Sequence, residues 1–394
     1  MGGGMLDTLT FVAIALTLSF ILSEFFFKIK YPRVIGQLIT GVILGLPFIK
    51  AFVTGDIQAD IGFLADLGII FLLLLTGMKI DIAKFKKSSK DTLILALFSV
   101  LFPFAMGFTL LKAFDYPTLA ALIFGGAISL TAEGTKLKVL LEMGALNTKL
   151  GVIMLGAGIL DDVFEIIFLS IVIVLSNHDY SALALLPVKL IIFVIVVLAT
   201  YKVFPKILRA VQREHSRIAT LSFIILFGLV VAVLSNKLDL GPIIGAFVAG
   251  VIISLVDRRK VSFKEDVQDL EEVTFAFLIP FFFINIGMHF DVTSLAQNAY
   301  FAIIVVVVAT LSKIVGAVLA TPFTSLNLRQ THLVGWGLNS RGAIELIIAE
   351  VALQNNLIPI EIYSALVFMA LVTTLMFPFV MKLIIGYDKK ILNE

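Results

Sequence analysis

The sequence predicts an all-α polytopic membrane protein with about 13 transmembrane helices. Hydrophobic residues make up 60% of its 394 residues and charged residues only 15%, and the mean hydropathy is +1.08. A water-soluble domain of this length does not have such a composition. Because the chain has no cysteine, its stability is expected to come from packing in lipid and not from disulfides.

Thirteen apolar runs bounded by charged residues, Pro and Gly are each long enough to be read as a membrane span. Gly, Thr, Ser and charged residues interrupt the fifth and twelfth spans near their centres, at residues 130–134 (LTAEG) and 338–342 (LNSRG). Such interruptions predict two discontinuous crossing helices. The spans are predicted near residues 6–27, 34–53, 61–78, 92–112, 117–144, 150–176, 182–205, 218–235, 240–256, 270–289, 296–322, 330–354 and 358–384.

The distribution of Lys and Arg predicts how the chain is oriented. If the spans alternate in direction, 24 of the 30 basic residues fall on one side of the membrane, four on the other and two inside spans. Loops rich in Lys and Arg stay in the cytoplasm. We therefore expect a multi-pass protein of the cell membrane with its N-terminus outside and its C-terminus in the cytoplasm.

Three correspondences at nearly one offset indicate an internal duplication. Residues 35–43 (IGQLITGVI) match 244–252 (IGAFVAGVI), residues 77–81 (GMKID) match 287–291 (GMHFD), and Thr131 corresponds to Ser340. A single linker span between the two copies makes the repeats inverted, which is typical of secondary transporters and not of enzymes. The predicted organisation is a first six-span repeat at 1–176 (core helices about 92–176), a linker span and cytoplasmic loop at 177–217, a second, inverted repeat at 218–385 (core helices about 296–384) and a cytoplasmic tail at 386–394.

Two adjacent aspartates, Asp161 and Asp162, lie halfway along the sixth span, with Glu165 one turn beyond them. An acid at the centre of an inserted helix costs about 2.5–3.5 kcal/mol, so such residues usually mark an ion or proton path. A carboxylate at this depth can bind a proton or a small cation but not both at once. This mutual exclusion is the physical basis of exchange.

Lys313 lies deep in the eleventh span, where its ammonium group cannot reach water, and we expect it to pair with Asp161. Two interpretations remain open. Lys313 could release a proton when a bound cation draws the aspartates away, or it could form a fixed structural salt bridge.

The residues around the two breaks are expected to support the site. Arg341 and Glu345 are four apart and could pair locally, bracing the second break. Glu133 could bind the cation, line its cytoplasmic path, or pair with Arg341 or Lys136, and pairing is favoured. Histidines near span ends have no metal-ligand spacing and are expected to be solvated; they are His178, His215, His289 and His332.

With these residues identified, nearly the whole chain resembles the monovalent cation:proton antiporter superfamily, specifically its electrogenic sodium/proton antiporters with thirteen spans. The resemblance rests on residues 158–163 (GILDDV), Lys313, 129–131 (SLT), 283–288 (FINIGM) and 340–342 (SRG). It implies that spans 4–6 and 11–13 form a moving core that slides against a dimerisation scaffold, in a homodimer.

By this resemblance Asp162 is the main carrier of the transported Na+ and of the proton, Asp161 is the partner of Lys313, and Thr131 contributes polar groups to the ion site. Residues expected to support the site are Glu133, Ser340, Arg341, Glu345 and Glu165. Na+ and H+ are substrates, and no cofactor or nucleic-acid partner is expected. One departure from the family pattern is Ala132 followed by the acidic Glu133.

The sequence therefore predicts exchange of Na+ (or Li+) for H+ by alternating access. Electroneutral relatives carry asparagine in place of the first aspartate, whereas this chain has both acids and the lysine, so we expect two protons per sodium ion. K+/H+ exchange is the alternative. A passive cation channel is a distant alternative, and so is an intramembrane aspartyl protease, whose two acids must converge whereas adjacent helical residues diverge by about 100°.

Overall fold

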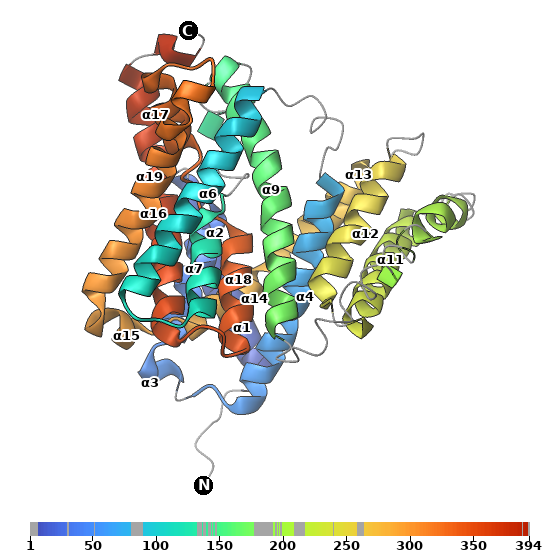
Figure 1. Ribbon diagram of the computed structural model, residues 1–394. Coiled ribbons are helices and arrows are strands. Elements are labelled where there is room, and N and C mark those ends of the chain that lie inside the picture. The colour runs from blue at the N-terminus through green and yellow to red at the C-terminus, as the bar shows by residue number, and fades with distance from the viewer. Residues whose placement is uncertain are drawn as a thin grey trace. The chain divides into compact units, whose positions relative to one another are not determined.

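In the computed structural model, all regular secondary structure in the described residues is helical (Figure 1). These are residues 7–29, 31–50, 52–79, 90–131, 148–176, 199–208, 217–238, 240–257, 264–387 and 389–392, with isolated positions between 136 and 145 and between 192 and 197. Within α9, the side chains of several residues, Asp162 among them, lie outside this description.

The helices before the second break are α1 (Thr8–Lys28), α2 (Arg33–Leu44), α3 (Pro47–Lys50), α4 (Gly55–Lys79), α6 (Lys90–Ala113), α7 (Thr118–Ser129), α9 (Lys149–Ser176), α11 (Arg217–Lys237), α12 (Pro242–Asp257), α13 (Lys264–Val273), α14 (Ile279–His289), α15 (Val292–Gln297), α16 (Ala299–Leu319) and α17 (Leu328–Gly337). After it come α18 (Ala343–Gln354) and α19 (Ile360–Tyr387). A π-helical turn at Thr274–Leu278 joins α13 to α14, and 3-10 turns lie at Thr321–Phe323 and Lys389–Leu392.

Seven helices in the described part of the chain are long and apolar enough to cross a membrane. Shorter apolar helices accompany them, at Arg33–Leu44, Thr118–Ser129, Lys149–Gly158 and Pro242–Val256. Large apolar side chains remain exposed on several of these helices, for example Phe20 of α1 and Leu311 of α16, as expected for surfaces that face lipid. The all-helical membrane class predicted from composition is confirmed, whereas the count of thirteen and the inverted repeat stay predictions.

One predicted boundary is wrong. The second span was expected over 34–53, but α2 ends at Leu44 and a separate short helix begins at Pro47, because proline has no backbone N–H to donate to the preceding turn of a helix. The cytoplasmic tail at 386–394 stays a prediction; α19 ends at Tyr387, and Ile391 and Leu392 beyond it are buried. Most of the seventh predicted span, 182–205, lies outside the described residues.

By its contacts the chain divides into two compact units. The first comprises residues 1–22, 37–81 and 173–285, and the second residues 23–36, 82–172 and 286–394. In the first unit, α12 packs against both α4 and α11, and the apolar cluster between them contains Leu74, Leu75, Val231 and Ile253.

The packing of α4 on α12 depends on two glycines that face each other. A Cβ on Gly77 would lie 2.2 Å from the carbonyl oxygen of Phe247, and a Cβ on Gly250 would lie 2.1 Å from that of Leu74. Both distances are far below van der Waals contact with backbone atoms. Small residues that let two backbones approach closely are typical of helix contacts in membranes.

Alanine at either glycine is therefore expected to force α4 and α12 apart and to destabilise the protein by about 1–3 kcal/mol, the usual cost of overpacking. Gly62→Ala is the matched control, because Gly62 lies in the same helix and a Cβ there has no atom within 4 Å. Thermal unfolding in detergent, followed by size-exclusion chromatography, measures the three variants. Unfolding of Gly77→Ala and Gly250→Ala at the temperature of Gly62→Ala would contradict this packing.

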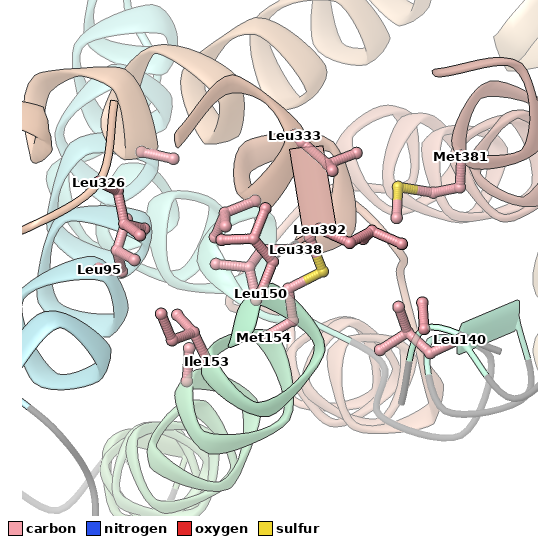
Figure 2. Packing of buried hydrophobic residues seen from close by; sticks show 14 of the residues in the cluster. Leu95, Leu140, Leu150, Ile153, Met154, Leu326, Leu333, Leu338, Met381 and Leu392 are labelled. Atoms are coloured by element: carbon pink, nitrogen blue, oxygen red, sulfur yellow. The ribbon is translucent and has the colours of Figure 1, made fainter. Parts of the chain in front are cut away.

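The second unit contains α6, α7, α16, α17, α18 and α19 and most of α9. An apolar cluster in this unit joins Leu95 of α6, Leu150 and Met154 of α9, Leu333 of α17 and Met381 of α19 (Figure 2). The segments that form this cluster are far apart in the sequence. Their side chains hold the two interrupted segments of the chain against one another.

Local signals explain where the helices of this unit begin. Asn327 caps α17 in a capping box with Gln330, each side chain accepting a hydrogen bond from the other residue's backbone N–H, which satisfies donors that a helix start leaves unpaired. The Asp291 side chain caps α15 by accepting from the N–H groups of Thr293 and Ser294. By contrast, α18 begins after Gly342 without a side-chain cap.

Candidate functional site

Both predicted interruptions begin where they were expected. Helix α17 ends at Gly337, and α18 begins only at Ala343, so they are separate helices (Figure 1). Helix α7 ends at Ser129 and is followed by the extended residue Leu130. Residues 132–135 lie outside the described part of the chain. Each interruption leaves carbonyl groups at a helix end without intrahelical partners.

Side chains from one break bind the backbone of the other. The Thr131 hydroxyl donates to the Leu338 carbonyl oxygen at 3.1 Å. The Arg341 guanidinium donates to the carbonyl oxygens of Leu130 and of Ala309 in α16, the latter at 3.1 Å. Arg341 is 2% exposed. The carbonyls of Leu130 and Leu338 lie at helix ends, whereas that of Ala309 lies within α16. Together these bonds hold α7, α16 and the segment before α18 in place.

Beside the breaks, Lys313 of α16 is completely buried. Its Nζ donates to Thr131 Oγ1 at 2.8 Å and lies 3.5 Å from Asp161 Oδ2. The structure thus places together the lysine and aspartate that the sequence predicts as partners. Asp161 is 1% exposed, and neither of its oxygens has a hydrogen bond to the described residues. The charge of the Lys313 ammonium therefore compensates this carboxylate.

Two further charged residues line the same region. Glu165 of α9 is buried and accepts the backbone N–H of Thr131 at 2.9 Å. Lys136, which the sequence places among the cytoplasmic basic residues, is instead fully buried and donates to the Met154 carbonyl oxygen at 2.9 Å. The physical reason is that the apolar cluster of the second unit encloses this turn, so the lysine must find a partner inside the protein.

The predicted local pair of Arg341 and Glu345 does not form. Arg341 lies in the extended segment before α18, so the four-residue helical spacing does not bring the two side chains together. The Arg341 amino groups donate to carbonyl oxygens. Within the described part of the chain, neither the Nε of Arg341 nor the two carboxylate oxygens of Glu345 have a hydrogen bond of normal geometry.

Several predicted site residues can be placed only in part. The backbone of Asp162 lies in α9, one position after Asp161, but its side chain is outside the description, and Glu133 and Ala132 lie wholly outside it. Ser340 is fully buried in the second break. Its neighbour Asn339, which sequence reasoning did not single out, is also fully buried, and neither atom of its amide has a partner among the described residues.

A second polar cluster connects the ends of α14, α18 and α19. Glu350 pairs with His289 (Nδ1 to Oε1, 2.8 Å) and accepts from the Tyr363 hydroxyl at 2.7 Å. Tyr363 also approaches the Ile286 carbonyl oxygen at 2.8 Å. His289 was predicted to be solvated, but its side chain is only 25% exposed, because its helix ends against α18. No spacing in the sequence relates these three residues, which come from three helices.

The described site therefore gathers buried cations (Lys136, Lys313, Arg341) and buried acids (Asp161, Glu165, Glu345) around two helix interruptions. Buried charges of both signs at such interruptions can exchange a small cation or a proton without a full set of side-chain ligands. Exchange of a cation for a proton at this site requires neither a nucleophile nor a pair of converging acids.

Comparisons with known proteins agree with this chemistry. The family model "Sodium/hydrogen exchanger, transmembrane" matches residues 12–385. The chain is 30% identical over 366 residues to a Na+/H+ antiporter of Enterococcus hirae, covering 89% of this chain and 91% of the relative. It is 26% identical to the Na+/H+-K+ antiporter GerN of Bacillus cereus, covering 92% of each.

Among solved structures, the sodium proton antiporter MjNhaP1 of Methanocaldococcus jannaschii has the same fold. The two structures superpose with a TM-score of 0.73 at 17% identity, over 98% of this chain and 99% of that one. The chain belongs to the sodium/hydrogen exchanger family of the monovalent cation:proton antiporter superfamily, whose members are membrane transporters and not enzymes.

Proposed function

We propose that this protein exchanges Na+ or Li+ for H+ across the cell membrane, with Asp162 as the main carrier of both ions. The observation that carries the proposal is the fully buried Lys313, flanked by Thr131 and Asp161 at the meeting point of two helix interruptions. Asp162 follows Asp161 directly in α9. A cation that binds these carboxylates must displace their proton, which couples the two fluxes.

Transport then proceeds by alternating access with an elevator-like movement of spans 4–6 and 11–13. This proposal is supported by the fact that most of the described residues of these spans fall within one compact unit. The protein is a homodimer, with its N-terminus outside and its C-terminus in the cytoplasm. The excess of Lys and Arg on the predicted cytoplasmic side supports that orientation.

Two protons are exchanged for each sodium ion, so each cycle moves net charge. The presence of both Asp161 and Lys313 supports this stoichiometry, because electroneutral relatives carry asparagine in place of the first aspartate. Asp162 carries one proton. Potassium–proton exchange is the alternative function, and the name of the relative GerN, a Na+/H+-K+ antiporter, favours it.

The test uses purified protein in sealed liposomes with an acidic lumen. On addition of sodium or lithium we expect the lumen to become alkaline, and the response to be absent in Asp162→Asn, which removes the exchangeable proton with almost no change in side-chain size. A response to potassium alone would replace the proposal by K+/H+ exchange. No response to any of the three cations from wild-type protein would reject cation–proton exchange.

The same liposomes test the stoichiometry. Charge movement couples to voltage at about 2.3 kcal/mol per elementary charge per 100 mV. The rate of sodium-dependent alkalinisation should therefore change when the membrane potential is clamped at different values. Rates that are independent of the clamped potential would reject two protons per sodium ion.

A further inference from the structure

We propose that Glu345 of α18 carries the second proton of this exchange, while Lys313 stays charged as the counter-ion of Asp161. The inference rests on the proposed sodium–proton exchange and identifies a residue that the cycle needs but that neither aspartate supplies. Four observations carry it: the burial of Glu345, its lack of partners, the charges around it and the engagement of the other buried acids.

Glu345 differs from every other buried carboxylate in the described residues. It is 1% exposed, and neither oxygen has a hydrogen bond of normal geometry. Asp161 is paired with Lys313, Glu165 accepts the Thr131 N–H, and Glu350 binds Tyr363 and His289. An ionised carboxylate that is buried without partners is costly. The ionised form of Glu345 has one backbone contact, the N–H of Gly342, which lies outside normal hydrogen-bond geometry.

The surrounding charges nevertheless stabilise the ionised form of Glu345. Arg341 and Lys313 are the two charged groups that interact electrostatically with Glu345. Glu345 also lies in the first turn of α18, where the positive end of the helix dipole favours a carboxylate. The guanidinium and ammonium groups are hydrogen-bonded elsewhere, to carbonyls and to Thr131. They act on Glu345 through their field and not through contact.

Among the described residues, the two helices with the most contacts to α18 place no other charged side chain near Glu345. Helix α18 contacts α7 and α19. Helix α7 contains no ionisable side chain, and the charged residues of α19, Glu361 and Lys382, lie near its two ends. On α18 itself, Glu350 is bound to Tyr363 and His289. Burial thus favours the protonated form of Glu345, whereas the nearby cations and the helix dipole favour the ionised form. A small change in the local electric field can therefore change its protonation.

Sodium binding changes the local electric field at Glu345. A cation that binds at Asp161 and Asp162 adds a positive charge to a dry region that already contains Lys313 and Arg341, and Coulomb interactions in such a region are only weakly screened. Glu345 then releases its proton as the ion enters and takes one up as the ion leaves. One proton lost from Asp162 and one from Glu345 balance the two protons per sodium ion. Lys313 keeps its hydrogen bond to Thr131 throughout.

The test measures the coupling ratio from the membrane potential at which sodium-driven proton flux reverses in liposomes. The wild-type protein is expected to exchange two protons per sodium ion. Glu345→Gln keeps the size of the side chain but cannot titrate. This variant should exchange one proton per sodium ion, and its flux should be independent of the membrane potential. A ratio of two in folded Glu345→Gln would overturn the inference and leave sodium–proton exchange standing. Wild-type protein without exchange would instead reject the proposed function itself.

Two further variants complete the test. Glu350→Gln is the matched control, because Glu350 is buried in the same helix but fully partnered, and its ratio should remain two. If Glu345→Gln does not fold, Glu345→Asp is measured instead. This shorter acid should keep the ratio of two but shift the pH dependence of the transport rate, and a pH profile identical to that of the wild type would overturn the inference.

Discussion

Lys313→Met is expected to lower the free energy of unfolding by about 3–5 kcal/mol, the usual cost of leaving a buried charge without its partner. Methionine has nearly the length of lysine but cannot compensate the Asp161 carboxylate 3.5 Å away. Asp161→Asn should be costly for the same reason, because it leaves a fully buried ammonium with Thr131 as its hydrogen-bonded partner.

The double variant provides the decisive comparison. When both partners of a buried ion pair are replaced by neutral residues of similar volume, the effect on stability is often small or favourable. Asp161→Asn combined with Lys313→Met should therefore recover most of the stability lost in each single variant. Chemical denaturation in detergent, followed by the fluorescence of the single tryptophan, Trp336, measures all four proteins. Additive losses would show that Asp161 and Lys313 are not energetically coupled.

Arg341→Met is expected to destabilise the protein by a similar amount, on the order of 3–5 kcal/mol. It removes the donors to the carbonyl oxygens of Leu130 and Ala309 and leaves the hydrogen bond from Thr131 to the Leu338 carbonyl as the described link between the two breaks. The Ala309 carbonyl still accepts a hydrogen bond from the Ser312 hydroxyl. Most of the lost stability therefore comes from the Leu130 carbonyl, which loses its hydrogen bond from Arg341. The buried acids Asp161, Glu165 and Glu345 also lose a compensating charge.

Two variants control for the charge and for the geometry of Arg341. Arg341→Lys keeps the charge but lacks the planar fork that reaches two carbonyls, and we expect an intermediate loss of stability. Arg329→Met removes an exposed arginine in α17 and should unfold like the wild type. If Arg341→Met and Arg329→Met unfold at the same denaturant concentration, the two breaks are not held together by Arg341.

The sequence was informative about the membrane class, the two interruptions and the partnership of Lys313 with Asp161. Each follows from a strong physical constraint. An apolar run long enough to cross a bilayer has few alternatives to a helix, Gly and polar residues at its centre interrupt it, and a lysine deep in a span needs an acid. Such constraints act on single segments and can be recognised without a structure.

Other features depended on packing between segments that are distant in the sequence. The four-residue spacing of Arg341 and Glu345 suggested a local pair, but α18 begins only at Ala343, and the guanidinium binds carbonyls from α7 and α16 instead. Lys136 was counted among the basic residues of the predicted cytoplasmic side and named as a possible partner of Glu133, because nothing in its sequence neighbourhood predicted its complete burial. The cluster of His289, Glu350 and Tyr363 joins three helices, so no sequence spacing could indicate it.

The most direct test of the central claim is the uptake of radioactive sodium into protein-containing liposomes with an outward proton gradient. We predict uptake above that of empty liposomes, which collapses when a proton ionophore dissipates the gradient while the membrane potential is held at zero. Such coupling requires a carrier that binds sodium and protons alternately. Uptake that continues unchanged after the proton gradient is gone would identify a passive cation channel and contradict exchange.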